Sequence, residues 1–264
     1  MASCRFCATP LHHLVVDLGM SPLCESYRTA EQLGAMEPFY PLRAYACDRC
    51  FLVQVEEYVS AAEIFGEYAY FSAYSESWLA HARAYCGMIV ERLGLGAHSF
   101  VVELGSNDGY LLQYLVARGI PVLGIDPAAN VAPAARARGV DTLTAFFGRE
   151  TARALVAEGR RADLLIGNNV LAQVSDLNGF VEGVATVLAP NGIVTMEFED
   201  GARFVLNRQS AARQIWLAAG ARAWHYRWDE SAGAWVDDRD GHELFGRLAA
   251  EVGGKLGIRL DVPA

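Results

Sequence analysis

Residues 99–126 read SFVVELGSNDGYLLQYLVARGIPVLGID, and this stretch decides the fold. Its first apolar run, residues 100–104, leads into a turn that contains glycine. A helix is expected next, with its apolar residues on one face: Leu111, Leu112, Leu115 and Val116. A second apolar run, residues 121–125, ends at Asp126. The order strand, turn, helix, strand predicts one right-handed βαβ unit of a doubly wound parallel sheet.

The turn after the first strand carries the chemistry of a binding site. Gly105 and Gly109 allow the backbone to turn sharply and to approach a ligand closely. The phosphate-binding fingerprint GxGxxG is absent, because Asn107 stands where its second glycine would be. Glu103 and Asp108 make the turn acidic and would repel a pyrophosphate.

Asp126 lies at the tip of the second strand, where a carboxylate can accept hydrogen bonds from both hydroxyls of a ribose. This spacing suits a nucleoside better than a dinucleotide. The acidic turn, with Glu103, favours a ligand that has a cationic centre, such as the sulfonium and amino group of S-adenosylmethionine. The alternative is a plain βαβ unit whose turn binds no ligand.

Composition narrows the class of protein. The chain has 264 residues, of which 53% are hydrophobic and 20% charged, so it can bury a large core. The net charge is −9 and no basic run is present, which argues against a nucleic-acid surface. No apolar stretch approaches the length of a membrane span. The chain starts with a CxxC motif and not with an apolar signal core, so we expect a cytoplasmic protein without membrane contact.

Two CxxC motifs predict a metal site. Cys4 and Cys7 form one motif, and Cys47 and Cys50 form the other. Two such knuckles can place four thiolates around one Zn²⁺, and four thiolates leave no open position for catalysis, so the zinc would be structural. A redox dithiol is the alternative for either pair. Two further cysteines are expected to be buried as small hydrophobic residues: Cys24 and Cys86. We place the end of this module at residue 59.

The segment that follows contains an aromatic cluster and then a helix. From residue 77 the apolar residues recur at helical spacing: Leu79, Ala82, Tyr85, Met88, Ile89 and Leu93. The cluster consists of Phe65, Tyr68, Tyr70, Phe71 and Tyr74. Its hydroxyls, above all those of Tyr70 and Tyr74, are suited to line a sugar pocket. Aromatic packing of a linker on the main domain is the alternative, and both stay open.

Strands and helices continue to alternate after Asp126. A third strand over residues 142–147 ends in Phe146 and Phe147, which could flank an adenine ring. A fourth strand over residues 162–168 places Asn168 and Asn169 at its carboxyl end, where ligands of open α/β sheets bind. A fifth strand is expected over residues 193–198. Helices between these strands imply a parallel sheet that is covered on both faces.

Residues 3–198 resemble a family of S-adenosylmethionine-dependent sugar C-methyltransferases, which methylate a carbon of a nucleotide-linked deoxysugar. The resemblance covers the CxxC pair and the segments DLGMSPLCESY, EPFYPL, EYAYFSAYS, VVELGSNDGYLL, GIPVLGIDPAANVA, FFGRETA and ADLLIGNNVLAQVSDLNGF. It implies structural zinc on the four knuckle cysteines and a nucleotide-sugar substrate that faces the tyrosine-rich segment. It implies a cofactor site that comprises Glu103, Gly105, Asn107, Gly109, Asp126, Phe147, Asn168 and Asn169.

In that family a proton is removed beside a carbonyl and the methyl group is transferred to the resulting carbanion. The family carries its base on a Tyr-x-His-Glu-His-Phe-type segment beyond the fifth strand. Residues 199–264 contain no such segment, so the catalytic residues stay unassigned. The resemblance therefore supports a methyltransferase cofactor site more strongly than it supports catalytic turnover.

After Pro190 the pattern changes to short antiparallel strands and one closing helix over residues 242–256. Residues 191–262 resemble frataxin, through GIVTMEFEDGARFVLNRQ, QIWLAA, HYRW, WVDDRDG, HELFGRLAAEV and IRLDV. Frataxins regulate iron–sulfur cluster assembly, contact its desulfurase and scaffold proteins, and bind iron weakly. The resemblance implies a partner surface at Asn207, Gln209 and Trp216. The family's long acidic first helix has no match here, which leaves iron binding to Glu197, Glu199 and Asp200.

The two resemblances meet inside one strand, GIVTMEF, at residues 192–198. We expect that one strand cannot easily lie at the centre of both sheets, and interpret the chain as a chimera of the two families. The alternative is that the tail hairpin forms the antiparallel edge of the parallel sheet, and whether the tail completes that sheet or folds separately stays open. The predicted fold is a class I methyltransferase-like doubly wound, mostly parallel sheet, preceded by a zinc module and followed by a frataxin-like antiparallel α+β tail. The predicted domains are residues 1–59, 60–190 and 191–264. The alternative function is a frataxin-like iron-binding or cluster-assembly module that is fused to a non-catalytic methyltransferase fragment.

Overall fold

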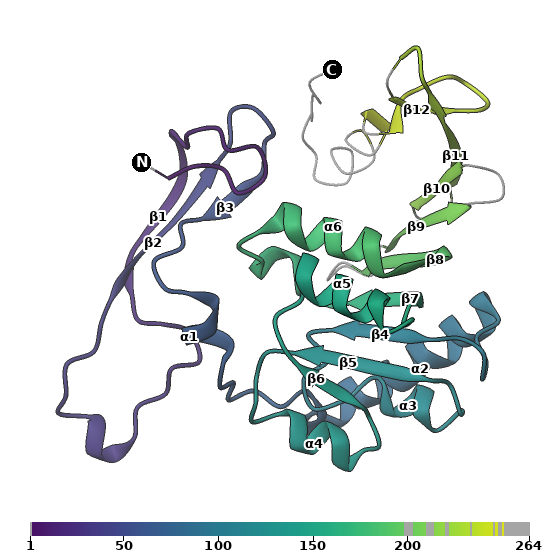
Figure 1. Ribbon diagram of the computed structural model, residues 1–264. Helices are drawn as coiled ribbons and strands as arrows, with labels where there is room; N and C mark the ends of the chain where they lie inside the picture. Colours follow the sequence, from purple (N-terminus) through teal and green to yellow (C-terminus); the bar gives the residue numbers. More distant parts are fainter. Residues whose placement is uncertain are drawn as a thin grey trace.

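The computed structural model describes residues 2–197, 203–209, 214–219, 222–232, 234–244, 246, 247 and 250. Figure 1 shows an extended N-terminal module at the left, a parallel sheet with helices at the centre, and an antiparallel tail at the upper right. No helix among the described residues combines the length and the apolar character that crossing a lipid bilayer requires.

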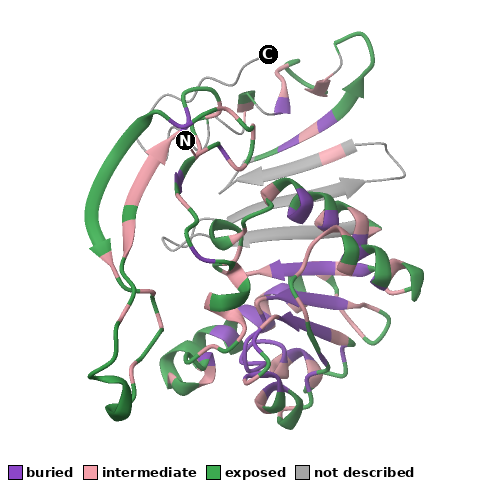
Figure 2. Cartoon of the chain, turned by 60° about the vertical axis from the view of Figure 1, so that its left-hand side comes forward, coloured by how far each residue is buried: buried purple, intermediate pink, exposed green. Residues whose placement is uncertain are grey.

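The N-terminal module is a three-stranded antiparallel sheet in the order β1 (His13–Ser21), β2 (Tyr40–Ala46) and β3 (Val53–Val55). A long loop with the short 3-10 helix η1 (Ala30–Gln32) joins β1 to β2. Figure 2 shows β1 exposed along almost its whole length. Cys24 lies in the long loop and is exposed, which contradicts the predicted burial, whereas Cys86 is buried as expected.

Two short helices, α1 (Ala61–Phe65) and η2 (Ser72–Tyr74), lead from this module to the long helix α2 (Glu76–Leu93). Ser75 caps α2 by accepting a hydrogen bond from the Trp78 backbone N–H, and Gly94 ends the helix in the left-handed conformation. The predicted apolar stripe is confirmed, because Ala82, Tyr85 and Ile89 are buried and the rest of the stripe packs against them.

The central parallel strands are β4 (Val101–Leu104), β5 (Val122–Asp126), β6 (Thr142–Thr144), β7 (Ala162–Gly167) and β8 (Leu188–Glu197). They lie in the order β6-β5-β4-β7-β8, as a doubly wound sheet requires. The helices between them are α3 (Gln113–Val116), α4 (Ala132–Ala137), α5 (Arg149–Ala157) and α6 (Leu177–Val187), with η3 (Leu171–Gln173) before α6.

The core has two parts, one on each face of the parallel sheet. Successive strand residues point to opposite faces, so Val101 packs with α2 and α3 while Val102 packs with α5 and α6. Figure 2 shows the central strands as the most deeply buried part of the chain. Helix α3 is shorter than the sequence predicts, because a series of turns occupies residues 106–112 before it begins.

The tail continues the same sheet. Its strands are β9 (Arg203–Gln209), β10 (Gln214–Ala219), β11 (Arg222–Asp229) and β12 (Ala234–Asp237), and each pairs antiparallel with the next. Strand β8 pairs parallel with β7 on one side and antiparallel with β9 on the other. Val194, for example, lies opposite Leu165 and Leu206. One strand therefore serves both sheets, contrary to our expectation, because a strand has two edges and each sheet uses only one.

Several predicted features of the tail fall outside the described residues. Most of the closing helix over residues 242–256 is among them, as are Glu199 and Asp200. The backbones of Asn207, Gln209 and Trp216 lie in β9 and β10, where Trp216 pairs with Asn207. The side chains of these three residues, and that of Glu197 in β8, are outside the described part.

Candidate functional site

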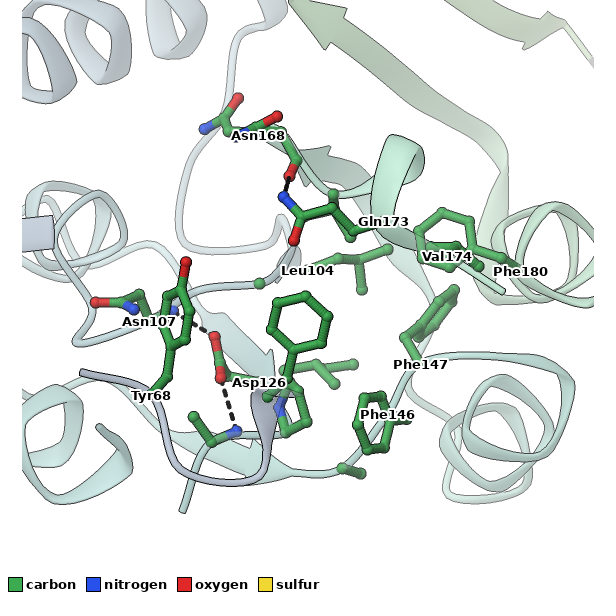
Figure 3. Close-up of a pocket in the computed structure, with 18 of the residues that line it drawn as sticks. Tyr68, Leu104, Asn107, Asp126, Phe146, Phe147, Asn168, Gln173, Val174 and Phe180 are labelled. Atoms are coloured by element: carbon green, nitrogen blue, oxygen red, sulfur yellow. Dashed lines mark hydrogen bonds between the residues drawn. The ribbon is translucent and has the colours of Figure 1, made fainter. Parts of the chain in front are cut away.

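A cavity of about 970 Å³ opens at the carboxyl ends of β4, β5 and β7. Ligands of open α/β sheets bind at this edge. Figure 3 shows Tyr68 beside Asp126, with Phe146 and Phe147 along another side of the cavity. The predicted residues that line it are Tyr70, Gly105, Asn107, Asp126, Phe147, Asn168 and Asn169.

Asp126 is held rigidly at the tip of β5. Its two carboxylate oxygens accept hydrogen bonds from the backbone N–H groups of Asn107 and Ala128, at 2.8 and 2.9 Å. Burial raises the pKa of Asp126, and these two backbone hydrogen bonds counteract part of the rise. Each oxygen keeps a further lone pair, so the carboxylate can still accept hydrogen bonds from a ligand in the cavity.

Asn107 and Asn130 hold the aromatic segment over the cavity. The Asn107 side chain accepts a hydrogen bond from the Ser72 N–H and donates one to the Tyr70 carbonyl, both at 2.9 Å. The Asn130 side chain does the same with the N–H and carbonyl of Tyr68, at 2.9 and 2.7 Å. Asn107 therefore binds a segment of the protein with its amide, and its contact with a cofactor stays a prediction.

Tyr70 lines the cavity as predicted for a substrate-facing residue, but Tyr74 does not. The Tyr74 side chain is 93% exposed in η2. Tyr74 is the last residue of the 3-10 helix η2, whose first residue, Ser72, still lines the cavity, so spacing along the segment could not distinguish the two tyrosines.

The two turn glycines have different roles. Gly105 lines the cavity at φ +65°, and a Cβ there would lie 2.7 Å from a methyl group of Val170. Gly109, at φ +77°, is not among the lining residues. A Cβ on Gly109 would meet Val140 and Ala135 at 3.0 to 3.3 Å, so this glycine lets the turn pack against α4.

Glu103 lies behind the cavity and does not line it, unlike the sequence-based expectation. Its side chain is 0% exposed, and neither carboxylate oxygen reaches a hydrogen-bond partner among the described residues. Burial raises the pKa of Glu103 well above its usual value, and the charges of Asp126 and Asp108 add to the rise. Burial therefore favours the protonated form of Glu103.

An aromatic wall that the sequence analysis missed forms the side of the cavity next to α2. The rings of Trp78 and His81 stack with centroids 5.1 Å apart, and Trp78 also stacks on Tyr110 at 6.0 Å. The Tyr110 hydroxyl accepts a hydrogen bond from the Asn168 side chain at 3.2 Å. Trp78, His81, Ala82 and Tyr85 share one side of α2, and that spacing could have identified the wall.

The four knuckle cysteines come together as predicted. Their sulfur atoms all lie within 4.8 Å of one another, and the Cys4–Cys50 and Cys7–Cys47 pairs are each 3.5 Å apart. Four thiolates at a Zn–S distance of about 2.3 Å would lie about 3.8 Å apart in a tetrahedron. Hydrogen bonds with the side chain and backbone of Thr9 lower the pKa of the Cys7 thiol to about 6, which favours its thiolate. The residues therefore fit a structural zinc ion.

A second group of candidate metal ligands, Asp237, Asp240 and His242, lies in the described part of the tail. Asp237 already accepts hydrogen bonds from the backbone N–H groups of Arg239, Asp240 and His225. The Arg247 guanidinium donates to His242 Nε2 at 2.9 Å and lies 3.6 Å from Asp240. This group does not fit a bound iron ion well, because the Arg247 guanidinium already contacts two of the three candidate ligands and its positive charge would repel a cation there.

Three family models match the chain. One described as "Putative zinc binding domain" matches residues 4–65, and one described as a methyltransferase domain matches residues 102–194. A frataxin-like domain matches residues 168–258, so α6 and the start of β8 belong to two matches. The frataxin match thus begins earlier than the sequence analysis placed it and includes α6, although that helix contains a single acid, Glu182.

The chain is similar to C-methyltransferase NovU of Streptomyces niveus, with 33% identity over 194 residues, 74% of this chain and 46% of that protein. It is also similar to iron-sulfur cluster assembly protein CyaY of Dechloromonas aromatica, with 44% identity over 62 residues, 24% of this chain and 57% of that protein. The chain therefore spans about half the length of these two curated relatives.

Among solved structures, a SAM-dependent methyltransferase from Thiobacillus denitrificans in complex with S-adenosyl-L-homocysteine has 22% identity and a TM-score of 0.34, and the match covers 44% of this chain and 47% of that one. The chain thus resembles a zinc-binding domain over residues 4–65, a methyltransferase domain over residues 102–194 and a frataxin-like domain over residues 168–258, and the last two share α6 and the start of β8.

Proposed function

We propose that the chain is an S-adenosylmethionine-dependent methyltransferase that binds its cofactor in the cavity above β4 and β5. The observation that supports this most strongly is the buried Asp126 carboxylate, which is fixed by two backbone N–H groups and lines a cavity of about 970 Å³. S-adenosylmethionine would supply an electrophilic methyl group. Asp126 would accept the ribose hydroxyls, and Phe146 and Phe147 would cover the adenine.

The acceptor that we propose is a nucleotide-linked keto-deoxysugar, methylated on the carbon next to its carbonyl. The support is the similarity to C-methyltransferase NovU and the aromatic wall with Tyr70, which offers ring faces and hydroxyls to a sugar. Such a reaction needs a group that removes the proton from that carbon. Among the described residues that line the cavity, His81 is the one histidine, so we assign it this proton transfer.

The test is exchange of the sugar proton for deuterium in D₂O, which mass spectrometry detects. Transfer of a labelled methyl group is measured in parallel. Because exchange reports proton removal alone, it separates the base from the methyl donor. We expect His81→Gln to lose exchange at least about a hundredfold, the usual contribution of a general base. The control is His98→Gln, an exposed histidine outside the cavity. Exchange at the unmodified rate in His81→Gln would overturn the assignment of His81.

A second candidate function concerns the tail. We propose that β9 and β10 dock onto a protein of iron–sulfur cluster assembly, through Asn207, Gln209 and Trp216. The support is the frataxin-like match and the pairing of Trp216 with Asn207 on adjacent strands. Titration of the full chain with a purified bacterial cysteine desulfurase tests this. Micromolar binding that Trp216→Ala weakens at least about tenfold would support it, and equal binding by both proteins would count against it.

A further inference from the structure

The first cysteine knuckle contacts the cavity wall through Arg5. Arg5 lies between Cys4 and Cys7, and its guanidinium donates hydrogen bonds to the carbonyls of Val174 and Val55, at 3.1 and 2.9 Å. A second hydrogen bond crosses the same contact, from the Asn178 side chain to the Phe6 carbonyl at 2.8 Å. The knuckle is therefore joined at one point to the segment between β7 and α6, through Val174, and at a second point to the first turn of α6, through Asn178.

That segment, residues 168–176, forms one wall of the cavity. A Val170 methyl group fills the space above Gly105, and Gln173 and Val174 also line the cavity. On the side of α5, Arg149 holds the wall through an ion pair with Asp176 at 3.1 Å. The wall is thus held between α5 and the knuckle. A displacement of Arg5 would therefore displace the wall where Val170 contacts the Gly105 turn of the proposed cofactor site.

The position of Arg5 depends in turn on the cysteine cluster. The buried Gln54 side chain accepts a hydrogen bond from the Arg5 backbone N–H at 2.9 Å and donates one to Cys4 Sγ at 3.2 Å. Within the knuckle, the backbone N–H of Ala8 donates to the Cys4 carbonyl at 2.9 Å. A zinc ion on the four thiolates would fix the sulfur positions, and loss of zinc would release this geometry.

We propose that Arg5 is a positioning residue. Its hydrogen bond to the Val174 carbonyl, here called the brace, holds the cavity wall of residues 168–176 and thereby links zinc occupancy of the knuckles to ligand affinity in the cavity. The identity of the ligand rests on the proposed function, but the brace itself does not. A hydrogen bond from a charged donor that is lost on substitution changes an equilibrium by roughly tenfold or more. We therefore expect changes of that size in the hydrogen exchange of the wall's backbone amides and in the affinity of the cavity for its ligand.

The experiment compares the zinc-loaded full chain with Arg5→Ala, Asn178→Ala and Arg49→Ala. Asn178→Ala removes the contact from outside the zinc module, so it decides the question even if Arg5→Ala loads zinc poorly. Arg49→Ala is the matched control, because Arg49 is an exposed arginine of the second knuckle. The readouts are hydrogen exchange of the backbone amides of residues 171–178 and calorimetric titration with S-adenosylhomocysteine.

We expect Arg5→Ala and Asn178→Ala to exchange these amides about tenfold faster and to bind S-adenosylhomocysteine about tenfold more weakly, while Arg49→Ala matches the unmodified chain. Removing zinc with a chelator should reproduce the effect in the unmodified chain and add little to Arg5→Ala. Unchanged exchange in both contact variants would overturn the brace. If the unmodified chain binds no S-adenosylhomocysteine, the proposed function fails, and the exchange data still decide the brace.

Discussion

The backbone N–H of Asn107 donates a hydrogen bond to the Asp126 carboxylate at 2.8 Å, and this bond joins the loops at the ends of two neighbouring parallel strands. The same residue, Asn107, uses its side chain to hold the aromatic segment above the cavity. This turn thus positions both the Asp126 carboxylate and the aromatic segment that lies over the cavity. The geometry explains why Asn107 stands where a dinucleotide-binding turn has glycine.

Asn130 is expected to hold the aromatic segment over the cavity independently of the turn that contains Asn107. Replacing Asn130 with alanine removes two hydrogen bonds to Tyr68, so we expect a loss of about 1 to 3 kcal/mol in the free energy of unfolding. Limited proteolysis should cleave faster within residues 66–75. Asn130→Asp keeps the acceptor and loses the donor, so its loss should be intermediate. If Asn130→Ala had the same rate of proteolysis and the same stability as wild type, the aromatic segment would be held by other contacts.

Glu103 should make stability depend on pH. Its pKa is raised by burial, so the folded chain keeps a proton that the unfolded chain releases above its lower pKa. The free energy of unfolding therefore falls as pH rises between the two pKa values, by about 1.4 kcal/mol per pH unit. Glu103→Gln removes this dependence. In denaturant unfolding we expect the variant to gain stability relative to wild type as the pH rises above about 5, until the pH passes the raised pKa of Glu103 in the folded chain.

The comparison between Glu103→Gln and wild type isolates one group, because every other titrating residue is common to both. The two proteins should converge near pH 4, where the unfolded wild-type carboxyl is also protonated. A stability difference that stays constant from pH 4 to pH 8 would mean that Glu103 does not titrate differently in the folded chain.

Zinc should be bound once per chain by the two knuckles. Cys47→Ser replaces a buried sulfur ligand, so we expect it to lose zinc and to lower the melting temperature. Cys24→Ser is the control, because Cys24 is exposed and lies outside the cluster. Elemental analysis and thermal unfolding measure both effects. Equal zinc content in Cys47→Ser and wild type would contradict the four-thiolate site.

Gly105 should tolerate no side chain. Gly105→Ala places a Cβ 2.7 Å from Val170 at a backbone conformation that costs a non-glycine residue about 1 kcal/mol or more. We expect a loss of about 1 to 3 kcal/mol in unfolding free energy, together with weaker binding in the cavity. Gly96→Ala, with open space around the added methyl group, is the matched control. A Gly105→Ala variant as stable as Gly96→Ala would argue against the close contact between the turn and residue 170.

The alternation of strands and helices was predictable from the sequence because apolar runs and turns mark each βαβ unit locally. The path of the aromatic segment was not, because it depends on the side chains of Asn107 and Asn130, which come from loops distant in sequence. Burial of Glu103 was also missed, since its position at a strand end says nothing of what covers it. The double use of β8 was only an alternative in the sequence analysis, for a different reason. Each family resemblance described one edge of that strand, and only the assembled sheet shows both.

The central claim is that the cavity binds S-adenosylmethionine through Asp126. Calorimetric titration of the full, zinc-loaded chain with S-adenosylhomocysteine, repeated with Asp126→Ala, tests it most directly. We predict micromolar binding, about −8 kcal/mol, that weakens at least about tenfold in the variant, because the ribose hydroxyls lose their buried acceptor. No heat of binding in a chain that holds zinc and unfolds cooperatively would contradict the claim, as would equal binding by Asp126→Ala.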